Sequence, residues 1–289
     1  MSRVAYVNGS YRPMAEAWVN VEDRGYQFAD GVYEVIAVHG GGWLIDEEGH
    51  LARLGRSLAE LQIAPPMSTG ALRLVMRQVA RRNHVENGMI YLQITRGVAA
   101  RNHAFPKHSL SSCVIMARRL PAPDPEEMSK GVSVIIIPDI RWRRRDIKTI
   151  SLLPNCLARQ QAADAGAYEA WMVDDDGLIT EGAASNAWIV TNDGELATRE
   201  ADFSILNGIT RLAVVRLAAE QGISFSERAF SREEALRARE AFVSSSTSLI
   251  KPVTVIDGKP VGDGLVGPIC RKLIAAYGVH MDSQRAAKS

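Results

Sequence analysis

One lysine differs from the others by its surroundings. Lysine is scarce in this chain, which has 7 lysines and 27 arginines. Lys148 follows a strongly apolar segment and lies between isoleucines within residues 146–153. At the end of a buried strand a lysine is partly desolvated, which lowers its pKa and favours the nucleophilic amine. On local sequence alone, however, a surface lysine that happens to follow Ile147 is the simpler interpretation.

Two other segments could bind a phosphate group. Gly208-Ile209-Thr210 leads into an apolar-faced helix, so backbone N–H groups and a hydroxyl lie at the positive end of the helix dipole. Residues 244–248 are five hydroxyl residues that follow a predicted strand and could supply a second contact. Taken singly, a simple helix cap and a polar loop explain these segments as well.

Three further candidates also have ordinary explanations. Glu181 precedes a glycine and small residues, so it could approach a flat ligand or could simply occupy a turn. Arg101 and His103 follow a predicted strand and could grip a carboxylate, although a solvated loop is the usual interpretation. Tyr33 lies on a strand, where core packing is the default.

Several function classes are disfavoured. The chain has no nucleotide-binding glycine loop, zinc-protease motif or serine-hydrolase motif. A net charge of +1 gives no overall field for nucleic acid or an anionic membrane. The arginine-rich run 141–145 is therefore interpreted as a solvated strand end or a subunit contact.

Cysteine usage and hydropathy predict the compartment. Cys113, Cys156 and Cys270 are far apart and odd in number, so they fit neither a disulfide framework nor a metal site. No apolar run is long enough to span a bilayer, and the N-terminus lacks a secretory pattern. We expect a cytoplasmic protein that binds no metal, membrane or nucleic acid.

Local patterns predict the elements that must position these residues. Asn8-Gly9 and the glycines 40–42 predict hairpin turns. Apolar spacing predicts helices over residues 51–61, from Ser68 onward, and over 153–165, 211–220 and 231–239. Strands are expected over 90–94, 113–117, 132–137, 170–173 and 186–190, and the last ten or so residues are expected to fray.

A proline-rich segment predicts the domain boundary. Pro121, Pro123 and Pro125 alternate with small and acidic residues, which predicts an extended linker over residues 121–128. We therefore expect an α/β (mixed α+β) fold, with an N-terminal domain over 1–120, a C-terminal domain over 129–289, and a ligand site between them.

Taken together, the motifs resemble the class IV aminotransferases, which are fold-type IV pyridoxal-phosphate enzymes, and among them the D-amino-acid transaminases. The resemblance runs from about residue 3 to residue 275, with its pieces in family order. These pieces are residues 22–28, 30–35, 50–54, 95–97 with 101–103, 139–142 with 146–148, 180–182 with 185–186, and 208–211.

The resemblance implies a role for each candidate. Lys148 would carry pyridoxal 5'-phosphate as a Schiff base and move the proton during catalysis, and Glu181 would face the pyridine nitrogen. The cofactor phosphate would be held by Arg53, Ile209, Thr210, and Ser246 or Thr247. Tyr33, Arg101 and His103 would bind the substrate carboxylate, the last two reaching in from the other subunit of a homodimer.

The Arg-x-His loop also implies the substrate. It resembles the D-amino-acid enzymes, which implies transfer of an amino group from a D-amino acid such as D-alanine to a 2-oxoacid such as 2-oxoglutarate. A branched-chain L-amino-acid or amine transaminase, or an aminodeoxychorismate lyase, is the alternative on the same fold. Ala183, Ala184 and Asn207 depart from the residues that better-known members carry.

Overall fold

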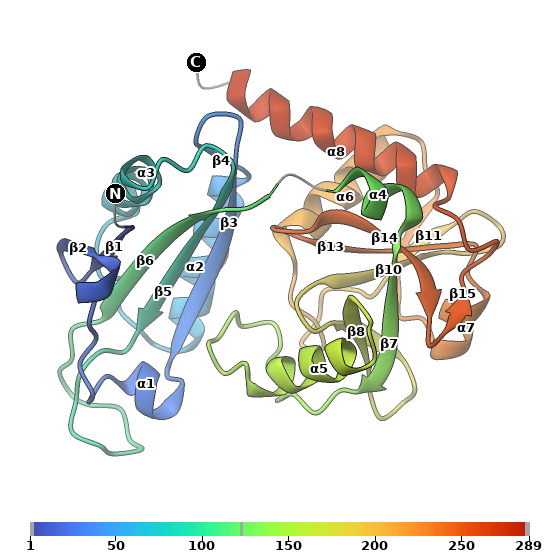
Figure 1. Cartoon of the computed structure of the whole chain (residues 1–289). Helices are drawn as coiled ribbons and strands as arrows, with labels where there is room; N and C mark the ends of the chain where they lie inside the picture. Colours follow the sequence, from blue (N-terminus) through green and yellow to red (C-terminus); the bar gives the residue numbers. More distant parts are fainter. Residues whose placement is uncertain (1–2, 122–123, 287–289) are drawn as a thin grey trace. The chain divides into compact units, whose positions relative to one another are not determined.

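The chain forms two compact units, each described here by itself. The computed structural model describes residues 3–121 and 124–286. Unit 1 comprises Met1–Ala122, Ile147–Ser151 and Gln284–Ser289, and unit 2 comprises Pro123–Asp146 and Leu152–Ser283 (Figure 1). The division after Ala122 falls within the predicted linker, and the short segment Ile147–Ser151 returns to unit 1 from the middle of unit 2.

Unit 1 is built on one antiparallel sheet. Its strands are β1 (Val4–Val7), β2 (Ser10–Pro13), β3 (Gly31–His39), β4 (Trp43–Leu44), β5 (Gly88–Thr95) and β6 (Ser112–Arg119). They lie in the order β2-β1-β6-β5-β3-β4. Both predicted hairpins are present, because β1 pairs with β2 across Asn8-Gly9 and β3 pairs with β4 across the glycines.

Two of the helices of unit 1 bury the apolar face of this sheet. The helices are η1 (Met14–Glu16), α1 (Arg24–Phe28), α2 (Glu47–Glu60) and α3 (Thr69–Arg82), and α2 and α3 contribute the core residues. Leu51, Leu54 and Leu58 of α2 join the core with Ile36 and Ile90 of the sheet, as their helical spacing predicts. Ser68 caps α3 by accepting a hydrogen bond from Ala71 N, also as predicted.

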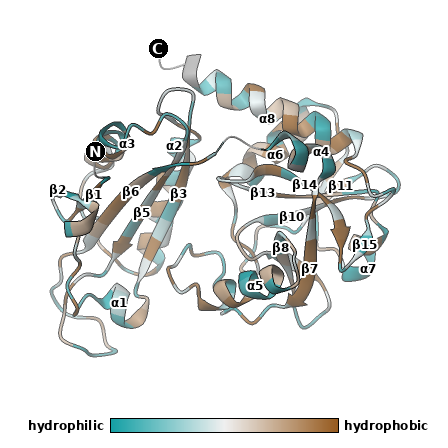
Figure 2. Ribbon diagram, in the orientation of Figure 1, coloured by the Kyte–Doolittle hydropathy of each residue, from teal (hydrophilic) through white to brown (hydrophobic). Residues whose placement is uncertain are grey.

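Unit 2 is built on a larger mixed sheet. Its strands are β7 (Val132–Pro138), β8 (Glu169–Val173), β9 (Ile179–Gly182), β10 (Asn186–Val190), β11 (Leu196–Thr198), β12 (Phe225–Glu227), β13 (Glu240–Ser245), β14 (Leu249–Ile256) and β15 (Lys259–Pro260). The order is β12-β11-β10-β13-β14-β7-β8-β9, and β15 pairs with β14. β7 is parallel to both of its neighbours, and Figure 2 shows it as a largely hydrophobic strand.

The helices of unit 2 are α4 (Pro125–Lys130), α5 (Leu153–Asp164), α6 (Ile209–Glu220), α7 (Arg232–Arg237) and α8 (Pro268–Ala286). Of these, α5, α6 and α7 lie at the predicted positions. Val214 and Leu217 of α6 pack with Phe242 of β13 and Leu273 of α8 in one buried cluster. The predicted mixed α/β class is confirmed.

The structure differs from the local predictions in three places. The segment predicted as an extended linker contains α4, because Pro125 suits a first helical position and the Asp124 carboxylate accepts from Glu126 N; residues 122–123 lie outside the described part. Glu181 lies on β9, a strand that was not predicted, so of the two interpretations the turn does not hold. α8 continues to Ala286, so residues 280–286 are helical where fraying was expected, and residues 287–289 lie outside the described part.

Among residues 3–121 and 124–286, no helix combines the length and the apolar character needed to cross a bilayer.

Candidate active site

Lys148 is held by backbone contacts with β3 and α2. Tyr33 N donates to the Lys148 carbonyl oxygen at 3.0 Å, and Lys148 N donates to Ser57 Oγ at 3.3 Å. Next to it, Thr149 forms an antiparallel bridge with Val32. The segment Ile147–Ser151 thus joins unit 1 at the start of β3, and the backbone of Lys148 is fixed there.

The side chain of Lys148 lies over an aromatic ring. Its Nζ is 4.2 Å from the ring centroid of Tyr33, which stacks on Tyr91 with 5.8 Å between the centroids. A ring face attracts a cation, so Tyr33 restrains the lysine head. Burial raises the pKa of Tyr91 to about 12 and keeps its hydroxyl neutral as a donor to Gln93 Oε1. Lys148 and Tyr33, two of the predicted site residues, therefore lie together.

Arg53 belongs to a buried cluster on α2, one helical turn before Ser57, whose hydroxyl contacts Lys148 N. Its Nε and Nη2 donate to the two carboxylate oxygens of Glu34, both at 2.8 Å. His50 Nδ1 lies 2.8 Å from Glu34 Oε2. Burial alone raises the pKa of Glu34, but the Arg53 guanidinium outweighs it and lowers that pKa to about 2. Burial also lowers the pKa of His50 and favours its neutral form.

The sequence motifs assigned no separate role to Glu34 or His50. Strand alternation places Glu34 on the same inward side as Val32 and Ile36, and a charged residue on an otherwise apolar face was the available signal. His50 and Arg53 are three residues apart on α2, so they lie on one helix face. Glu34 thus fixes how the Arg53 guanidinium is oriented.

Glu181, in unit 2, is surrounded by hydrogen-bond donors. Its Oε1 accepts from Arg141 Nη1 at 2.5 Å and from Leu206 N at 3.1 Å. Its Oε2 accepts from Asn186 Nδ2 at 3.0 Å. Burial raises the pKa of Glu181 above its ordinary value, and the neighbouring Arg141 guanidinium opposes that rise.

Arg141 corrects the interpretation of the arginine-rich run. Its side chain is only 8% exposed, and it pairs with Asp139 as well as Glu181. The solvated strand end therefore does not describe Arg141, although Arg143 in the same run is exposed. A run of like charges in a sequence suggests side chains that are exposed to solvent. The carboxylate and hydroxyl that pair with Arg141 are brought to it only in the tertiary structure, where β9, which carries Thr180 and Glu181, pairs with β8.

Apart from Arg53, which lies on α2 of unit 1, the predicted phosphate contacts lie at two places in unit 2. Ile209 and Thr210 are buried at the start of α6, whose N-cap, Gly208, offers no side-chain cap to the first N–H groups. Ser246 and Thr247 follow β13 in the turn before β14, with Ser246 half-buried and Thr247 exposed. α6 and β13 share a core, so both segments are anchored in the same unit.

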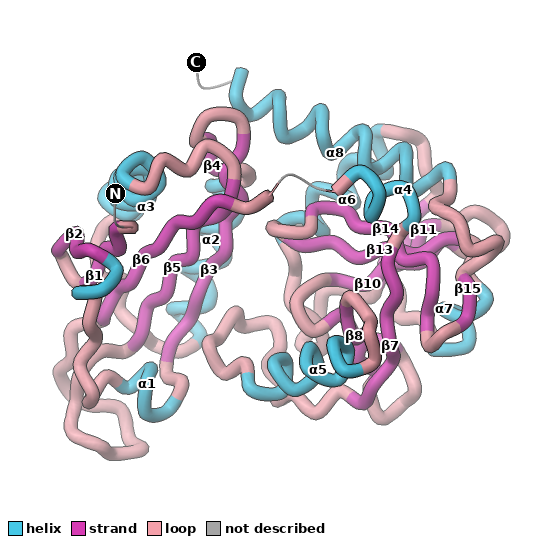
Figure 3. Tube along the Cα trace, viewed as in Figure 1, coloured by secondary structure: helices cyan, strands magenta, loops and turns pink. Residues whose placement is uncertain are grey.

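The loop with Arg101 and His103 packs on α1. Arg101 lies with its guanidinium carbon 4.5 Å from the ring centroid of Phe28, and the His103 ring lies 5.3 Å from the same centroid. Arg24 holds the loop by donating to the carbonyl oxygen of Asn102 at 2.5 Å. Figure 3 shows the connection between β5 and β6 as loop. Among the described residues, no hydrogen bond or ring contact joins Arg101 or His103 to Tyr33.

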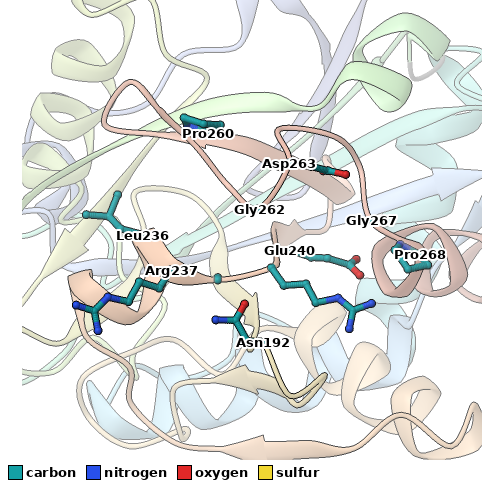
Figure 4. Close-up of a pocket in the computed structure, with 11 residues that line it drawn as sticks. Asn192, Leu236, Arg237, Glu240, Pro260, Gly262, Asp263, Gly267 and Pro268 are labelled. Carbon is teal, nitrogen blue, oxygen red and sulfur yellow. The ribbon is translucent and has the colours of Figure 1, made fainter.

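A separate cavity of about 510 Å³ lies elsewhere in unit 2 (Figure 4). Its lining includes Arg237, Glu240, Pro260 and Pro268, and none of the predicted site residues. In the part of the chain that the structure describes, no cluster of histidine, cysteine and carboxylate groups could hold a metal ion. This cavity therefore adds no residue to the candidate site that includes Lys148 and Glu181.

Comparison with known proteins identifies the family. The model of the class IV amino-transferases matches residues 31–256, which include the Lys148 segment, Glu181 and the start of α6. The chain belongs to the class IV aminotransferases. It is an enzyme of the transaminase type, as its resemblance to that family implies.

Individual relatives show which members of the family the chain is similar to. The chain is 40% identical to a D-alanine aminotransferase of Bacillus licheniformis over 270 residues, which are 93% of this chain and 94% of that protein. It is 38% identical to a D-alanine aminotransferase of Staphylococcus haemolyticus, over 96% of this chain and 98% of that one. The branched-chain amino acid aminotransferase of Escherichia coli has a similar structure, with a TM-score of 0.90, 26% identity, and coverage of 97% and 95% of the two chains.

Proposed function

We propose that this chain is a pyridoxal-phosphate-dependent D-amino-acid aminotransferase, with D-alanine as amino donor and 2-oxoglutarate as acceptor. The observation that carries the chemistry is Lys148, whose amine lies 4.2 Å over the Tyr33 ring on a backbone fixed against β3. The identity of 40% to a D-alanine aminotransferase over nearly the whole chain supports the substrate class.

The residues present fit pyridoxal 5'-phosphate. A carboxylate has about four acceptor positions, and three protein donors reach Glu181 among the described residues. One position on Oε2 therefore remains for the N–H of a pyridine ring. The uncapped start of α6 at Gly208-Ile209-Thr210 fits a phosphate, because its N–H groups carry the positive end of the helix dipole.

The cofactor supplies an electron-accepting ring and takes up the amino group between the two half-reactions. Lys148 provides the amine that holds the cofactor and then carries the proton to and from the substrate Cα. Glu181 stabilises the positive charge on the ring nitrogen. Arg53, oriented by Glu34, contributes to the phosphate site, together with Ile209, Thr210, and a hydroxyl of Ser246 or Thr247.

Arg101 and His103, with Tyr33, would bind the substrate carboxylate. Both side chains are exposed, and the loop that carries them is anchored by Arg24, so they are presented outward in a defined geometry. Fixing the carboxylate on one side decides which hydrogen of the substrate Cα points at Lys148. This loop supports D-specificity.

A homodimer is part of the proposal. Seven exposed apolar side chains come from the segment between η1 and α1, from α1 itself and from the β5–β6 loop, and we call them the α1 patch: Trp18, Val19, Val21, Tyr26, Val98, Phe105 and Leu110. Asp23 pairs with Val98, so the two segments lie side by side, and the patch includes residues on both sides of Arg101 in its loop. A second copy of the chain that covers this patch would receive that loop.

We further propose that the protein acts in the cytoplasm. Cys113, Cys156 and Cys270 are free thiols, as in proteins of a reducing compartment.

The test follows the cofactor absorption band of the holoenzyme. D-Alanine should remove the band within one turnover, and 2-oxoglutarate should restore it. L-Leucine and L-valine should leave it unchanged. A band that responds only to the L-amino acids would overturn D-specificity and favour a branched-chain enzyme, to which the structure is also similar.

A variant separates substrate binding from cofactor binding. Arg101→Ala should raise KM for D-alanine while the cofactor band keeps its position and intensity. Arg118→Ala, an exposed arginine on β6, serves as the matched control and should leave KM unchanged. Loss of the band in Arg101→Ala would show that the loop supports the cofactor instead of the substrate.

A further inference from the structure

Arg141 connects two buried carboxylates in unit 2. Its Nε and Nη2 donate to the two oxygens of Asp139 at 3.0 and 2.8 Å, and its Nη1 donates to Glu181 Oε1 at 2.5 Å. The Asp139 carboxylate has no exposed surface and also accepts from Thr180 Oγ1 at 2.8 Å. Arg145 Nε lies 3.2 Å from the same carboxylate.

Because Arg141 donates hydrogen bonds to both carboxylates, one acceptor position of Glu181 stays open. An arginine can bind one carboxylate through two parallel hydrogen bonds. Here Asp139 takes that two-bond contact, so Arg141 reaches Glu181 through one N–H only. If the fork closed on Glu181 instead, both of its oxygens would be engaged by Arg141. Together with Leu206 N and Asn186 Nδ2, this would fill the acceptor positions of Glu181.

We propose that Asp139 and Arg141 are positioning residues that hold Glu181 with one acceptor position of Oε2 open for the ring N–H of the cofactor. The inference rests on the proposed function, since it assigns Glu181 to the pyridine nitrogen. Asp139 keeps Arg141 from closing on Glu181, and Arg141 favours the ionised form of the buried Glu181. Neither residue touches the substrate.

The pKa shifts of Glu181, Arg141 and Asp139 agree with these two roles. Burial alone lowers the pKa of Arg141, but Glu181 and Asp139 raise it above its ordinary value, so the guanidinium stays charged. Burial by itself raises the pKa of Asp139, but its hydrogen bonds from Arg141 and Thr180 lower it overall. Asp139 also works against ionisation of Glu181, whereas Arg141 favours it.

The two residues are therefore expected to have opposite effects on the pKa of Glu181. The experiment uses the full-length apoprotein with glutamate labelled with carbon-13 at Cδ, and Glu181→Gln identifies the Glu181 signal. In Arg141→Gln the Glu181 pKa should rise by about one unit or more. In Asp139→Asn it should fall, because Arg141 is released to Glu181. Arg143→Gln, an exposed arginine of the same run, should leave it unchanged.

A second readout uses the holoenzyme reconstituted with cofactor labelled with nitrogen-15 in the ring. The ring nitrogen should be protonated in the unmodified enzyme and less protonated in both Arg141→Gln and Asp139→Asn. Cofactor affinity should fall roughly tenfold or more in each, since a charge-assisted hydrogen bond is lost. Arg141→Lys retains a cation beside Glu181 and should keep the Glu181 pKa near that of the unmodified protein. If Arg141→Gln does not fold, the fall of the Glu181 pKa in Asp139→Asn still tests the inference.

Failure of this inference differs from failure of the proposed function. If the unmodified holoenzyme transaminates D-alanine but Glu181 titrates identically in Arg141→Gln, Asp139→Asn and the Arg143→Gln control, the inference is wrong. It is also wrong if Arg141→Gln and Asp139→Asn shift the Glu181 pKa in one direction. If the unmodified enzyme transaminates no amino acid, the proposed function fails instead, while the apoprotein titration still tests the relation of Arg141 to Glu181.

Discussion

At the scale of single residues, each candidate group is set by a partner distant in the sequence. The amine of Lys148 lies over Tyr33, the guanidinium of Arg53 is oriented by Glu34, and Glu181 is bound by Arg141. Buried charges are stable only when paired and hydrogen-bonded, so these pairs are as necessary to the site as the groups that they orient.

Replacing Lys148 by alanine should abolish covalent attachment of the cofactor and lower the rate of transamination at least about 10²-fold, since nucleophile and proton carrier are both removed. Borohydride reduction followed by peptide mapping checks the attachment in the unmodified enzyme. An adduct on any lysine other than Lys148 contradicts the assignment. Lys107→Ala, an exposed lysine in unit 1, is the control.

Replacing Glu34 by glutamine should lower the free energy of unfolding by about 3–5 kcal/mol, because the buried Arg53 loses its counter-charge. Chemical denaturation measures this change. Glu16→Gln, an exposed acid in the same unit, should change stability by less than about 0.5 kcal/mol. Equal effects of the two substitutions would show that the ion pair contributes little.

The same cluster predicts a dependence of stability on pH. The pKa of Glu34 falls from 4.5 to about 2 on folding, so its stabilisation is complete above about pH 4.5 and is lost as the pH falls toward 2. The lowered pKa of His50 acts in the same direction from its ordinary range downward. Denaturation at several pH values should give a flatter acid limb for Glu34→Gln than for the unmodified protein.

At the scale of elements, a short segment places Lys148, the proposed catalytic lysine. Thr149 Oγ1 and Ile150 N both donate to the carbonyl oxygen of Gly31, at 3.0 and 3.1 Å. A side chain at Gly31 would lie 2.7 Å from the Ile94 carbonyl oxygen of β5 and 3.1 Å from Cδ1 of Ile150 in the same segment as Lys148. The glycine thus allows the backbone approach on which the position of Lys148 depends.

Gly31→Ala should therefore destabilise unit 1 by about 1–3 kcal/mol and weaken cofactor attachment. Gly55→Ala is the matched control, because Gly55 lies within α2 with no atom within 4 Å of the added carbon. That change should stabilise the helix by about 0.5–1 kcal/mol. Thermal denaturation and the cofactor band of both variants check the prediction, which fails if Gly31→Ala behaves like the control.

At the scale of the whole molecule, the α1 patch is the feature that a single chain does not explain. Val21 is 76% exposed and Leu110 is 92% exposed, although both are apolar. The patch includes residues on both sides of Arg101 in its loop, so association of two chains and substrate binding should be linked.

The double variant Val21→Asp with Leu110→Asp should shift the protein toward monomer and lower transaminase activity strongly at low protein concentration. Sedimentation equilibrium measures the association. Leu74→Asp on α3 is the control, since Leu74 is 67% exposed but lies outside the patch. A double variant that remains dimeric would exclude the α1 patch as the interface.

The sequence by itself determined the local elements and the candidate residues. Turn glycines, helix caps and apolar periodicity act within a few residues, so the hairpins, α2, α3, α5 and α6 could be predicted. Family motifs in order indicated Lys148 and Glu181 as candidates. Only the tertiary structure decided their partners, because contacts between residues far apart in sequence follow from sheet pairing and leave no local pattern. Thr149 meets Gly31 across 118 residues, and Arg141 meets Glu181 across 40.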